Sequence, residues 1–224
     1  MVLYASILSG IREDALGQIL SASVISIPAA LVIALILVPQ EKQNLAVEAE
    51  IRSEASSSMD AITRGTLDGV KLLINVIAML IVFVALVALI NIVLAVLPQV
   101  NGEPITLQRI LGLVFAPLVW LMGIPADEVF TAGSLMGIKT ILNEFLAYLQ
   151  LVALPENSLS ARSEMIMIYA LCGFANFGSL GIMLGGMGTL VPERRTEIAG
   201  LGLKSILAGT LATMMTGTIV GILI

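Results

Sequence analysis

An uncharged stretch, residues 165–192, restricts the fold of this chain more than any other feature of its sequence. About 20 apolar residues suffice to cross a bilayer as a helix, so this stretch is long enough to span one. It nevertheless contains six glycines and the polar pair Asn176 and Ser179. Each interior glycine weakens a helix by roughly 1 kcal/mol relative to alanine. We therefore expect a membrane helix that breaks near residues 174–179.

A helix break at membrane depth indicates a class of protein. Backbone groups released from a helix cannot face lipid, and they are tolerated only beside protein or a polar cavity. Many secondary transporters build their substrate sites from such broken helices, with polar side chains at the break. The stretch is therefore typical of a solute carrier.

The composition supports a membrane protein and excludes other classes. Hydrophobic residues make up 58% of the 224 residues and charged residues 12%, and the mean hydropathy is +1.04. Soluble domains carry about 25% charged residues. The net charge of −5 offers no basic face to a nucleic acid, and histidine, the commonest metal ligand, is absent. We predict an all-α polytopic membrane protein with no bound metal or cofactor.

Four charge-free stretches predict the membrane spans. They are residues 15–38, with Pro28 as a kink, and residues 72–97, 165–192 and 205–224. The second is the most apolar, and we expect it to face lipid or the core of an oligomer. Residues 107–123 are either a short crossing or an interfacial helix, in which Trp120 would be an anchor.

Two short apolar segments, residues 127–137 and 143–154, predict a re-entrant helical hairpin. Each has roughly 11 or 12 residues, which is too few to span a bilayer. They are separated by residues 137–142, which would form a polar tip.

The sequence also predicts how these elements are grouped. Residues 59–70 have an amphipathic pattern that indicates either an interfacial helix or a helix of a soluble loop. Residues 1–71 would hold the end of a helix that starts before the chain, one span and this cytoplasmic segment. Residues 72–97 would be an oligomer-core span, and residues 98–224 half of a transport domain with the hairpin, the broken helix and the final span.

Basic residues orient the predicted spans. Seven of the eleven lie in two connections, at Lys42, Arg52, Arg64, Lys71, Arg194, Arg195 and Lys204. The positive-inside rule places both connections in the cytoplasm. The last span then leaves the C-terminus outside, and the hairpin enters the membrane from the outer side.

Glu144 is the strongest candidate for a functional side chain. A charge at the centre of a membrane helix costs about 2.5–3.5 kcal/mol on insertion scales, so a carboxylate there indicates a function. It lies next to Asn143 and near Lys139 and Thr140. We expect Glu144 to accept hydrogen bonds from hydroxyls of a substrate. The alternative is a structural ion pair between Glu144 and Lys139.

Asn176 and Ser179 are three residues apart and would face one cavity if the local backbone is helical. The alternative is that they join packed helices by hydrogen bonds. Phe174 would supply an apolar wall or simply pack. A carboxylate, an amide, a hydroxyl and an aromatic ring on two broken elements suit a neutral, planar solute rich in hydroxyls.

Two segments resemble the signatures of a known family. Residues 137–148, GIKTILNEFLAY, and residues 170–182, ALCGFANFGSLGI, closely resemble those of the concentrative nucleoside transporters. Residues 20–30, LSASVISIPAA, and residues 191–195, VPERR, look like the same family. The resemblance runs along the full chain, and two long motifs in the right order make it specific.

The resemblance implies a function and a site. It implies cation-coupled nucleoside transport across the cytoplasmic (inner) membrane, driven by Na⁺ or in some members by H⁺. It also implies a homotrimer with residues 72–97 near the threefold axis. The implied substrate site has Glu144, Asn176 and Ser179 on the ribose, Phe174 in the base pocket, and Asn143 and Thr140 beside them.

The resemblance covers the C-terminal half of the family. The earlier half carries a first hairpin that contacts the base and a broken helix that helps bind sodium, and no residues here correspond to them. We expect this chain to supply the ribose-binding half of an inverted-repeat transporter, with the cation ligands largely outside it, and to be inactive alone. The alternative is a non-transporting fragment or assembly partner. An intramembrane enzyme is disfavoured, because no second carboxylate, histidine or nucleophile shares the depth of Glu144.

Overall fold

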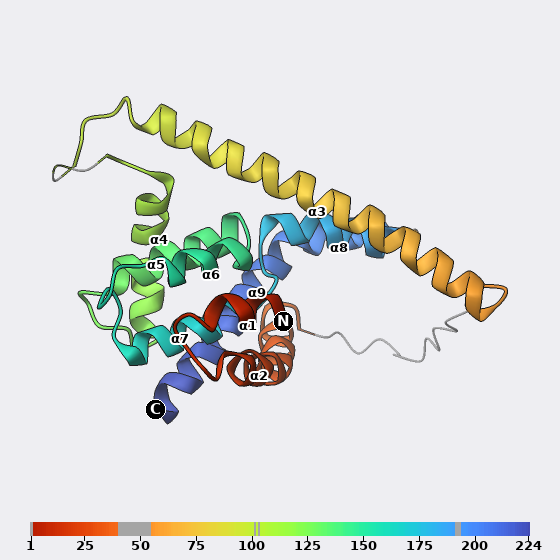
Figure 1. Ribbon diagram of the computed structural model, residues 1–224, viewed down its shortest axis with the longest axis horizontal. Helices are drawn as coiled ribbons and strands as arrows, with labels where there is room; N and C mark the ends of the chain where they lie inside the picture. Colours follow the sequence, from red (N-terminus) through yellow and green to blue (C-terminus); the bar gives the residue numbers. More distant parts are fainter. Residues whose placement is uncertain (1, 40–54, 101, 103, 191–193) are drawn as a thin grey trace. The chain divides into compact units, whose positions relative to one another are not determined.

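The computed structural model describes residues 2–39, 55–100, 102, 104–190 and 194–224 (Figure 1). Their regular secondary structure is helical, which confirms the predicted all-α class for the described residues. The helices are α1 (Val2–Leu8), α2 (Ala15–Leu37), α3 (Ser58–Leu94), α4 (Leu107–Leu121), α5 (Val129–Ile141), α6 (Glu144–Val152), α7 (Ala161–Leu171), α8 (Phe177–Leu190) and α9 (Arg195–Leu223). The chain divides into two compact units, Met1–Pro39 with Ile90–Ile224, and Gln40–Leu89.

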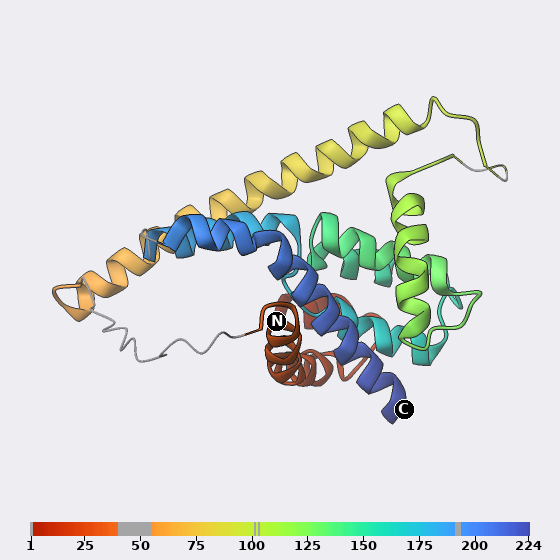
Figure 2. The same cartoon turned by 180° about the vertical axis from the view of Figure 1, so that it is seen from behind.

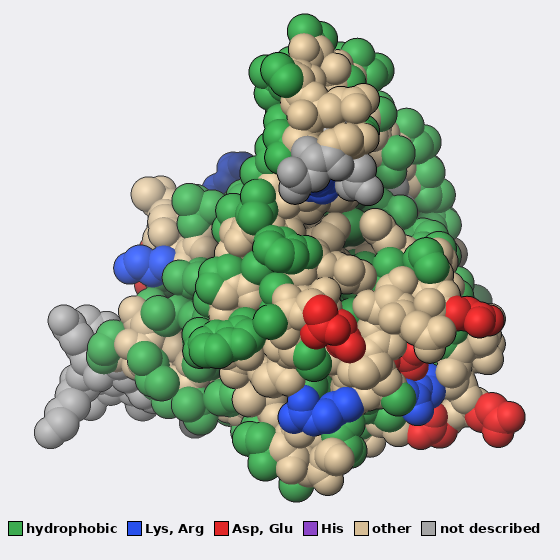
Figure 3. All heavy atoms as spheres, turned by 90° about the vertical axis from the view of Figure 1, so that its left-hand side faces the viewer, with side chains coloured by type: hydrophobic (Ala, Val, Ile, Leu, Met, Phe, Trp, Pro, Cys, Tyr) green, Lys and Arg blue, Asp and Glu red, His purple; other side chains and the backbone are tan. Residues whose placement is uncertain are grey.

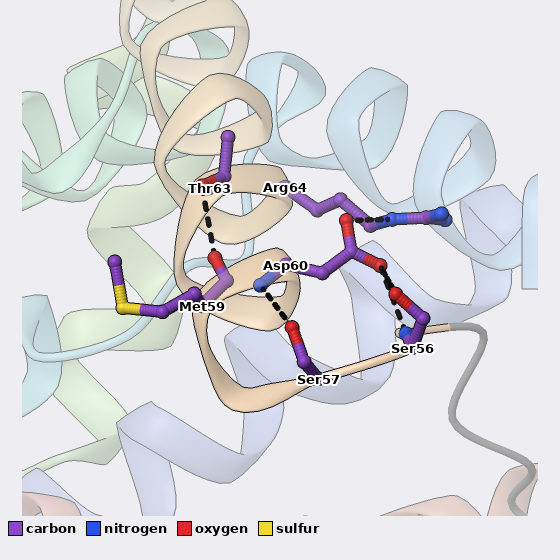
Figure 4. Close-up of polar contacts among 6 residues, drawn as sticks. All are labelled: Ser56, Ser57, Met59, Asp60, Thr63 and Arg64. Atoms are coloured by element: carbon purple, nitrogen blue, oxygen red, sulfur yellow. Dashed lines mark hydrogen bonds and ion pairs between the residues drawn. The ribbon is translucent and has the colours of Figure 1, made fainter.

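The start of α3, in the smaller unit, is held by local hydrogen bonds (Figure 4). Ser57 Oγ accepts a bond from the Asp60 amide at 3.2 Å, and Asp60 Oδ2 accepts one from the Ser56 amide at 2.9 Å. The first bond satisfies a backbone donor that the first turn of a helix leaves free, and the second ties the residues just before α3 to that turn. Hydrogen bonds from the Ser56 amide, the larger cause, and from the Arg64 guanidinium hold the pKa of Asp60 below its usual range.

The amphipathic residues 59–70 and the following span form one helix rather than two elements. α3 runs without interruption from Ser58 to Leu94. No proline occurs in that range, so nothing in the sequence forces the backbone to leave the helical conformation.

α9 is the central helix of the larger unit. It contacts α2, α7 and α8, and Figure 2 shows it as the long helix that leads to the C-terminus. It begins at Arg195, whereas the sequence predicted a span from residue 205. The helix can start within the charged segment because Arg194 forms an ion pair with Glu197 at 2.8 Å beside its first turn.

Glycines let α9 approach α7 closely. A Cβ atom built on Gly217 would lie 2.8 Å from the carbonyl oxygen of Ile166, and one built on Gly221 would lie 2.7 Å from the side chain of the same residue. Small residues four positions apart are a common means of bringing two membrane helices together.

α5 and α6 pack against each other as a helical hairpin joined by Leu142 and Asn143. The predicted end of the first segment at Gly137 was wrong, because α5 continues to Ile141. A Cβ atom on Gly137 would lie 2.3 Å from the Cβ atom of Leu111 in α4. Close packing against α4 therefore accounts for this glycine inside a helix, although glycine alone disfavours helical structure.

Two of the described helices, α2 and α9, are long and apolar enough to cross a membrane. α2 buries only a stripe of small or apolar residues, Ala15, Ile19, Ala22 and Ala29, and exposes large apolar side chains elsewhere. A helix that is apolar on all sides is suited to lipid or to the interior of a larger assembly. On the face in Figure 3, most charged side chains gather in one part and hydrophobic side chains cover much of the rest.

Candidate functional site

The predicted third span is interrupted. α7 ends at Leu171 and α8 begins at Phe177, so residues 172–176 leave the helical conformation. The interruption overlaps the predicted break near residues 174–179 and starts slightly before it. A Cβ atom on Gly173 would lie 2.6 Å from Thr213 Cγ2, so the interrupted segment passes close to α9.

Asn176 and Ser179 restart the helix as a reciprocal cap. Asn176 Oδ1 accepts a hydrogen bond from the Ser179 amide at 2.7 Å, and Ser179 Oγ accepts one from the Asn176 amide at 3.3 Å. Ser179 Oγ also contacts the carbonyl oxygen of Phe174. This is the capping-box pattern with serine in place of the usual Glu or Gln. The three-residue spacing of Asn176 and Ser179 is therefore explained by helix capping, in addition to any role of the two side chains in the site.

Glu144 lies between the hairpin and the interrupted helix. It is the first residue of α6, and it is 3% exposed. Its Oε1 accepts a hydrogen bond from the Tyr4 hydroxyl at 2.5 Å, and its Oε2 accepts one from Asn176 Nδ2 at 3.2 Å. The N-terminus of α6 favours its negative charge. An ionised carboxylate offers about four lone-pair sites, so these two bonds leave acceptor capacity.

Tyr4 is a site residue that the sequence did not reveal. It lies in α1, and its ring packs against that of Tyr148 in α6 with the centroids 5.4 Å apart. Tyr148 is itself fixed by a hydrogen bond from its hydroxyl to the carbonyl oxygen of Ile168 at 2.8 Å. The hydrogen bond from Tyr4 thus comes from an element that is distant in the sequence and held by packing.

The alternative of an ion pair between Lys139 and Glu144 is wrong. The Lys139 ammonium is fully buried and donates to the carbonyl oxygen of Ala170 at 2.9 Å and to the hydroxyl of Thr213 at 2.5 Å. Lys139 therefore joins the hairpin to the end of α7 and to α9, and Glu144 is joined to Tyr4 and Asn176 instead.

Thr140 and Asn143 each make a bond within the hairpin. Thr140 Oγ1 donates to the Met136 carbonyl at 2.8 Å, and Asn143 Oδ1 accepts from the Leu146 amide at 2.9 Å as the N-cap of α6. The structure therefore gives both residues local roles, while leaving the Asn143 amide group with donors to spare.

A cavity of about 420 Å³ adjoins the interruption. It is lined by residues 172–176 together with side chains of α2, α8 and α9. Asn176 and Ser179 line it, and so does Phe174, which is 71% exposed. Glu144, Asn143 and Thr140 do not line it, so Glu144 reaches the cavity only through its hydrogen bond to Asn176.

A membrane-length helix interrupted beside a hairpin of two short helices, with a buried carboxylate between them, is typical of secondary transporters. The family described as "Na+ dependent nucleoside transporter C-terminus" matches residues 18–221, and this chain belongs to that family.

Several relatives align with more than nine-tenths of this chain. YutK of Bacillus subtilis, an uncharacterized transporter, is 40% identical over 92% of this chain and 52% of its own length. The nucleoside permease NupC of Helicobacter pylori is 39% identical over 93% of this chain and 51% of its own. Human solute carrier family 28 member 3 is 35% identical over 92% of this chain and 33% of its own. These relatives are transporters rather than enzymes.

Solved structures show the same fold. A structure of CNTnw in an inward-facing substrate-bound state is 38% identical, with a TM-score of 0.74 over 87% of this chain and 47% of that one. The chain thus spans about half the length of CNTnw and of its bacterial relatives.

Proposed function

We propose that this chain takes part in nucleoside transport and contributes the part of the site that binds the ribose. The observation that carries the proposal is the buried hydrogen bond from Asn176 to Glu144, which joins the start of α6 to the start of α8. Ribose hydroxyls are donors that a carboxylate with remaining lone pairs can accept. Because the solute would be neutral, the site needs no cationic side chain to neutralise it.

The remaining predicted site residues fit around this pair. Ser179 caps the same turn as Asn176, and the exposed ring of Phe174 offers a face on which a base can stack. Asn143 keeps amide donors, and Thr140 keeps a hydroxyl lone pair, beside Glu144 in the sequence. In this proposal the solute enters between the hairpin and the interruption and displaces local contacts.

The hairpin would be re-entrant, as half of an inverted repeat. α5 has 13 residues and α6 has 9. At about 1.5 Å per residue they reach ~20 and ~14 Å, well short of the ~30 Å hydrocarbon core. Two such helices would therefore enter and leave the bilayer from one side, with Glu144 at depth.

The proposed assembly is a homotrimer with residues 72–97 near its axis. Along the sequence, this span follows an N-terminal part, residues 1–71, and precedes a transport-domain half, residues 98–224. The described side chains of α3 support this, because Ile77, Ile81 and Val84 are apolar and exposed. A particle with three times the mass of the 23.5 kDa chain in detergent would agree with the proposal. A monomer at all concentrations would contradict it.

Transport would be coupled to Na⁺ or H⁺, with most cation ligands outside this chain. The sodium/nucleoside cotransporter 1 of rat, 33% identical over 92% of this chain, supports such coupling. The test is uptake of labelled uridine by cells that express the protein from its own gene and lack other nucleoside carriers. We expect accumulation that stops when Na⁺ is replaced and the proton gradient is dissipated. Absence of carrier-dependent uptake would refute the proposal.

We further propose an inner-membrane protein with residues 41–71 and 193–204 in the cytoplasm and the C-terminus outside. Residues 40–54 and 191–193 lie outside the described part of the chain, but Ser56 and Arg194 beside them are described and exposed. In a Cys172→Ser background, cysteines at 56 and 194 should react with an impermeant maleimide only in opened cells. A cysteine at 224 should react in intact cells, and the reverse pattern would contradict the orientation.

A further inference from the structure

We propose that the Lys139 ammonium is a tethered cation, built into the helix interruption, that positions Asn176 and Glu144 for the solute. It lies where transporters with broken helices hold a coupling ion, namely among carbonyl groups at the end of a half-helix. The inference deepens the proposed function and rests on it for the role of the site. The anchoring itself can be tested without transport.

The groups around the ammonium form an oxygen site. Ala170 is in the last turn of α7, where carbonyl groups lack partners within the helix and carry the negative end of its dipole. Lys139 Nζ donates to this carbonyl and to Thr213 Oγ1. Thr213 in turn donates to the Thr210 carbonyl at 3.0 Å, which leaves its lone pairs for the ammonium. A carbonyl and a hydroxyl are ligands that a hard cation also prefers.

The charge of Lys139 is not needed for packing. The side chain is 0% exposed, and within the described residues no carboxylate lies within ion-pair distance of its ammonium. Glu144 attracts the ammonium only from beyond ion-pair distance. Burying a charge without a carboxylate in contact is unfavourable, and an apolar side chain of the same length would fill this space at a lower cost. The ammonium is therefore best explained by what it does to the end of α7.

Lys139 and Glu144 occupy opposite ends of the interrupted elements. The ammonium lies at the C-terminal end of α7, and the carboxylate lies at the N-terminus of α6 and is bonded to Asn176, just before α8. Each charge thus matches the sign of the helix dipole that it meets. Because the chain from Ala170 to Asn176 is short, anchoring the first of these residues limits the movement of the second.

Cys172 provides a reporter of this anchoring. It is the single cysteine of the chain, lies within the interruption and lines the cavity. Its Sγ lies 3.8 Å from Ser23 Oγ of α2, so a thiol reagent must reach a packed position. Release of the α7 end should expose this thiol, whether or not the protein transports anything.

The experiment compares Lys139→Met with the matched control Lys204→Met, which removes an exposed lysine on α9. We expect Lys139→Met to raise the rate of maleimide labelling of Cys172 at least about tenfold, and to raise the uridine KM by a similar factor at unchanged protein amount. Lys204→Met should change neither. In Lys139→Ala, methylammonium should fill the site and slow labelling again, whereas the larger tetramethylammonium should not.

The outcomes separate the two proposals. The proposed role of the Lys139 ammonium is overturned if the Lys139→Met variant leaves the labelling of Cys172 unchanged. It is also overturned if methylammonium does not slow the labelling in Lys139→Ala. If Lys139→Met does not reach the membrane, Thr213→Val removes one acceptor while keeping the shape. It should then raise labelling by a smaller factor, and no change again overturns the inference. Absence of uridine uptake by cells that express the unaltered protein from its own gene refutes the proposed function. The labelling of Cys172 still decides whether Lys139 anchors the end of α7.

Discussion

In cells that express the protein from its own gene, replacing Glu144 with Gln is expected to reduce uridine uptake at least about 100-fold without changing the amount of protein in the membrane. Hydrogen bonds to a charged group contribute about 1.5–3 kcal/mol each, and each 1.4 kcal/mol is about tenfold in affinity. If the carboxylate accepts two hydrogen bonds from ribose hydroxyls, losing its charge should weaken solute binding about tenfold or more for each bond. In the unaltered protein, Tyr4 and Asn176 each donate a hydrogen bond to the Glu144 carboxylate. The amide group of Gln would face one of these donors and could not accept its hydrogen bond.

The measurement is the initial rate of labelled uridine uptake at several concentrations, normalised to immunoblots of the membrane fraction. The matched control is Glu156→Gln, which removes an exposed carboxylate from the connection between α6 and α7. It should transport like the unaltered protein. Equal uptake by the Glu144→Gln variant would exclude Glu144 from the ribose site, even if the protein proves to be a nucleoside carrier.

The sequence predicted the elements whose cause is local. The absence of charge marks α2 and the region of α7 and α8, and the glycines around residue 173 mark the interruption. Local rules failed at Gly137, because glycine weakens an isolated helix and the chain cannot reveal that Leu111 lies against it. They also failed at the start of α9, where charged residues form the first turns of a helix instead of a loop.

The candidate site was predictable only where a polar side chain stands out in an apolar stretch. Glu144 and Asn176 satisfy that condition, and the capping spacing of Asn176 and Ser179 is itself a local pattern. The partners of these residues were not predictable. Tyr4 reaches Glu144 across 140 positions of sequence, and Lys139 reaches Thr213 across 74. Such bonds depend on tertiary packing, for which a single sequence has no local signature.

The 224 residues alone are expected not to accumulate uridine against a concentration gradient. Coupling requires that a cation and the solute affect each other's binding, so both sites must be present in one assembly. At the interruption, the Ala170 carbonyl and the Thr213 hydroxyl, which would suit a cation, are already bonded to Lys139. Phe174 is 71% exposed and lines the cavity, so its ring leaves room for a further wall of the proposed base pocket. The chain spans about half the length of YutK and NupC, and in the half-site proposal the missing wall and cation ligands come from a partner half.

Proteoliposomes with an imposed inward Na⁺ or H⁺ gradient test this expectation. Vesicles with the 224-residue chain should hold no more labelled uridine than empty vesicles, while NupC of Helicobacter pylori, reconstituted in the same way, serves as the positive control. Gradient-dependent accumulation by the chain alone would refute the half-site proposal, because this chain would then contain a complete coupled site. If a separate polypeptide matching the N-terminal half of the relatives restores accumulation, the chain is an assembly partner whose ribose site becomes functional only in the complex. The same Glu144→Gln change should abolish that restored activity.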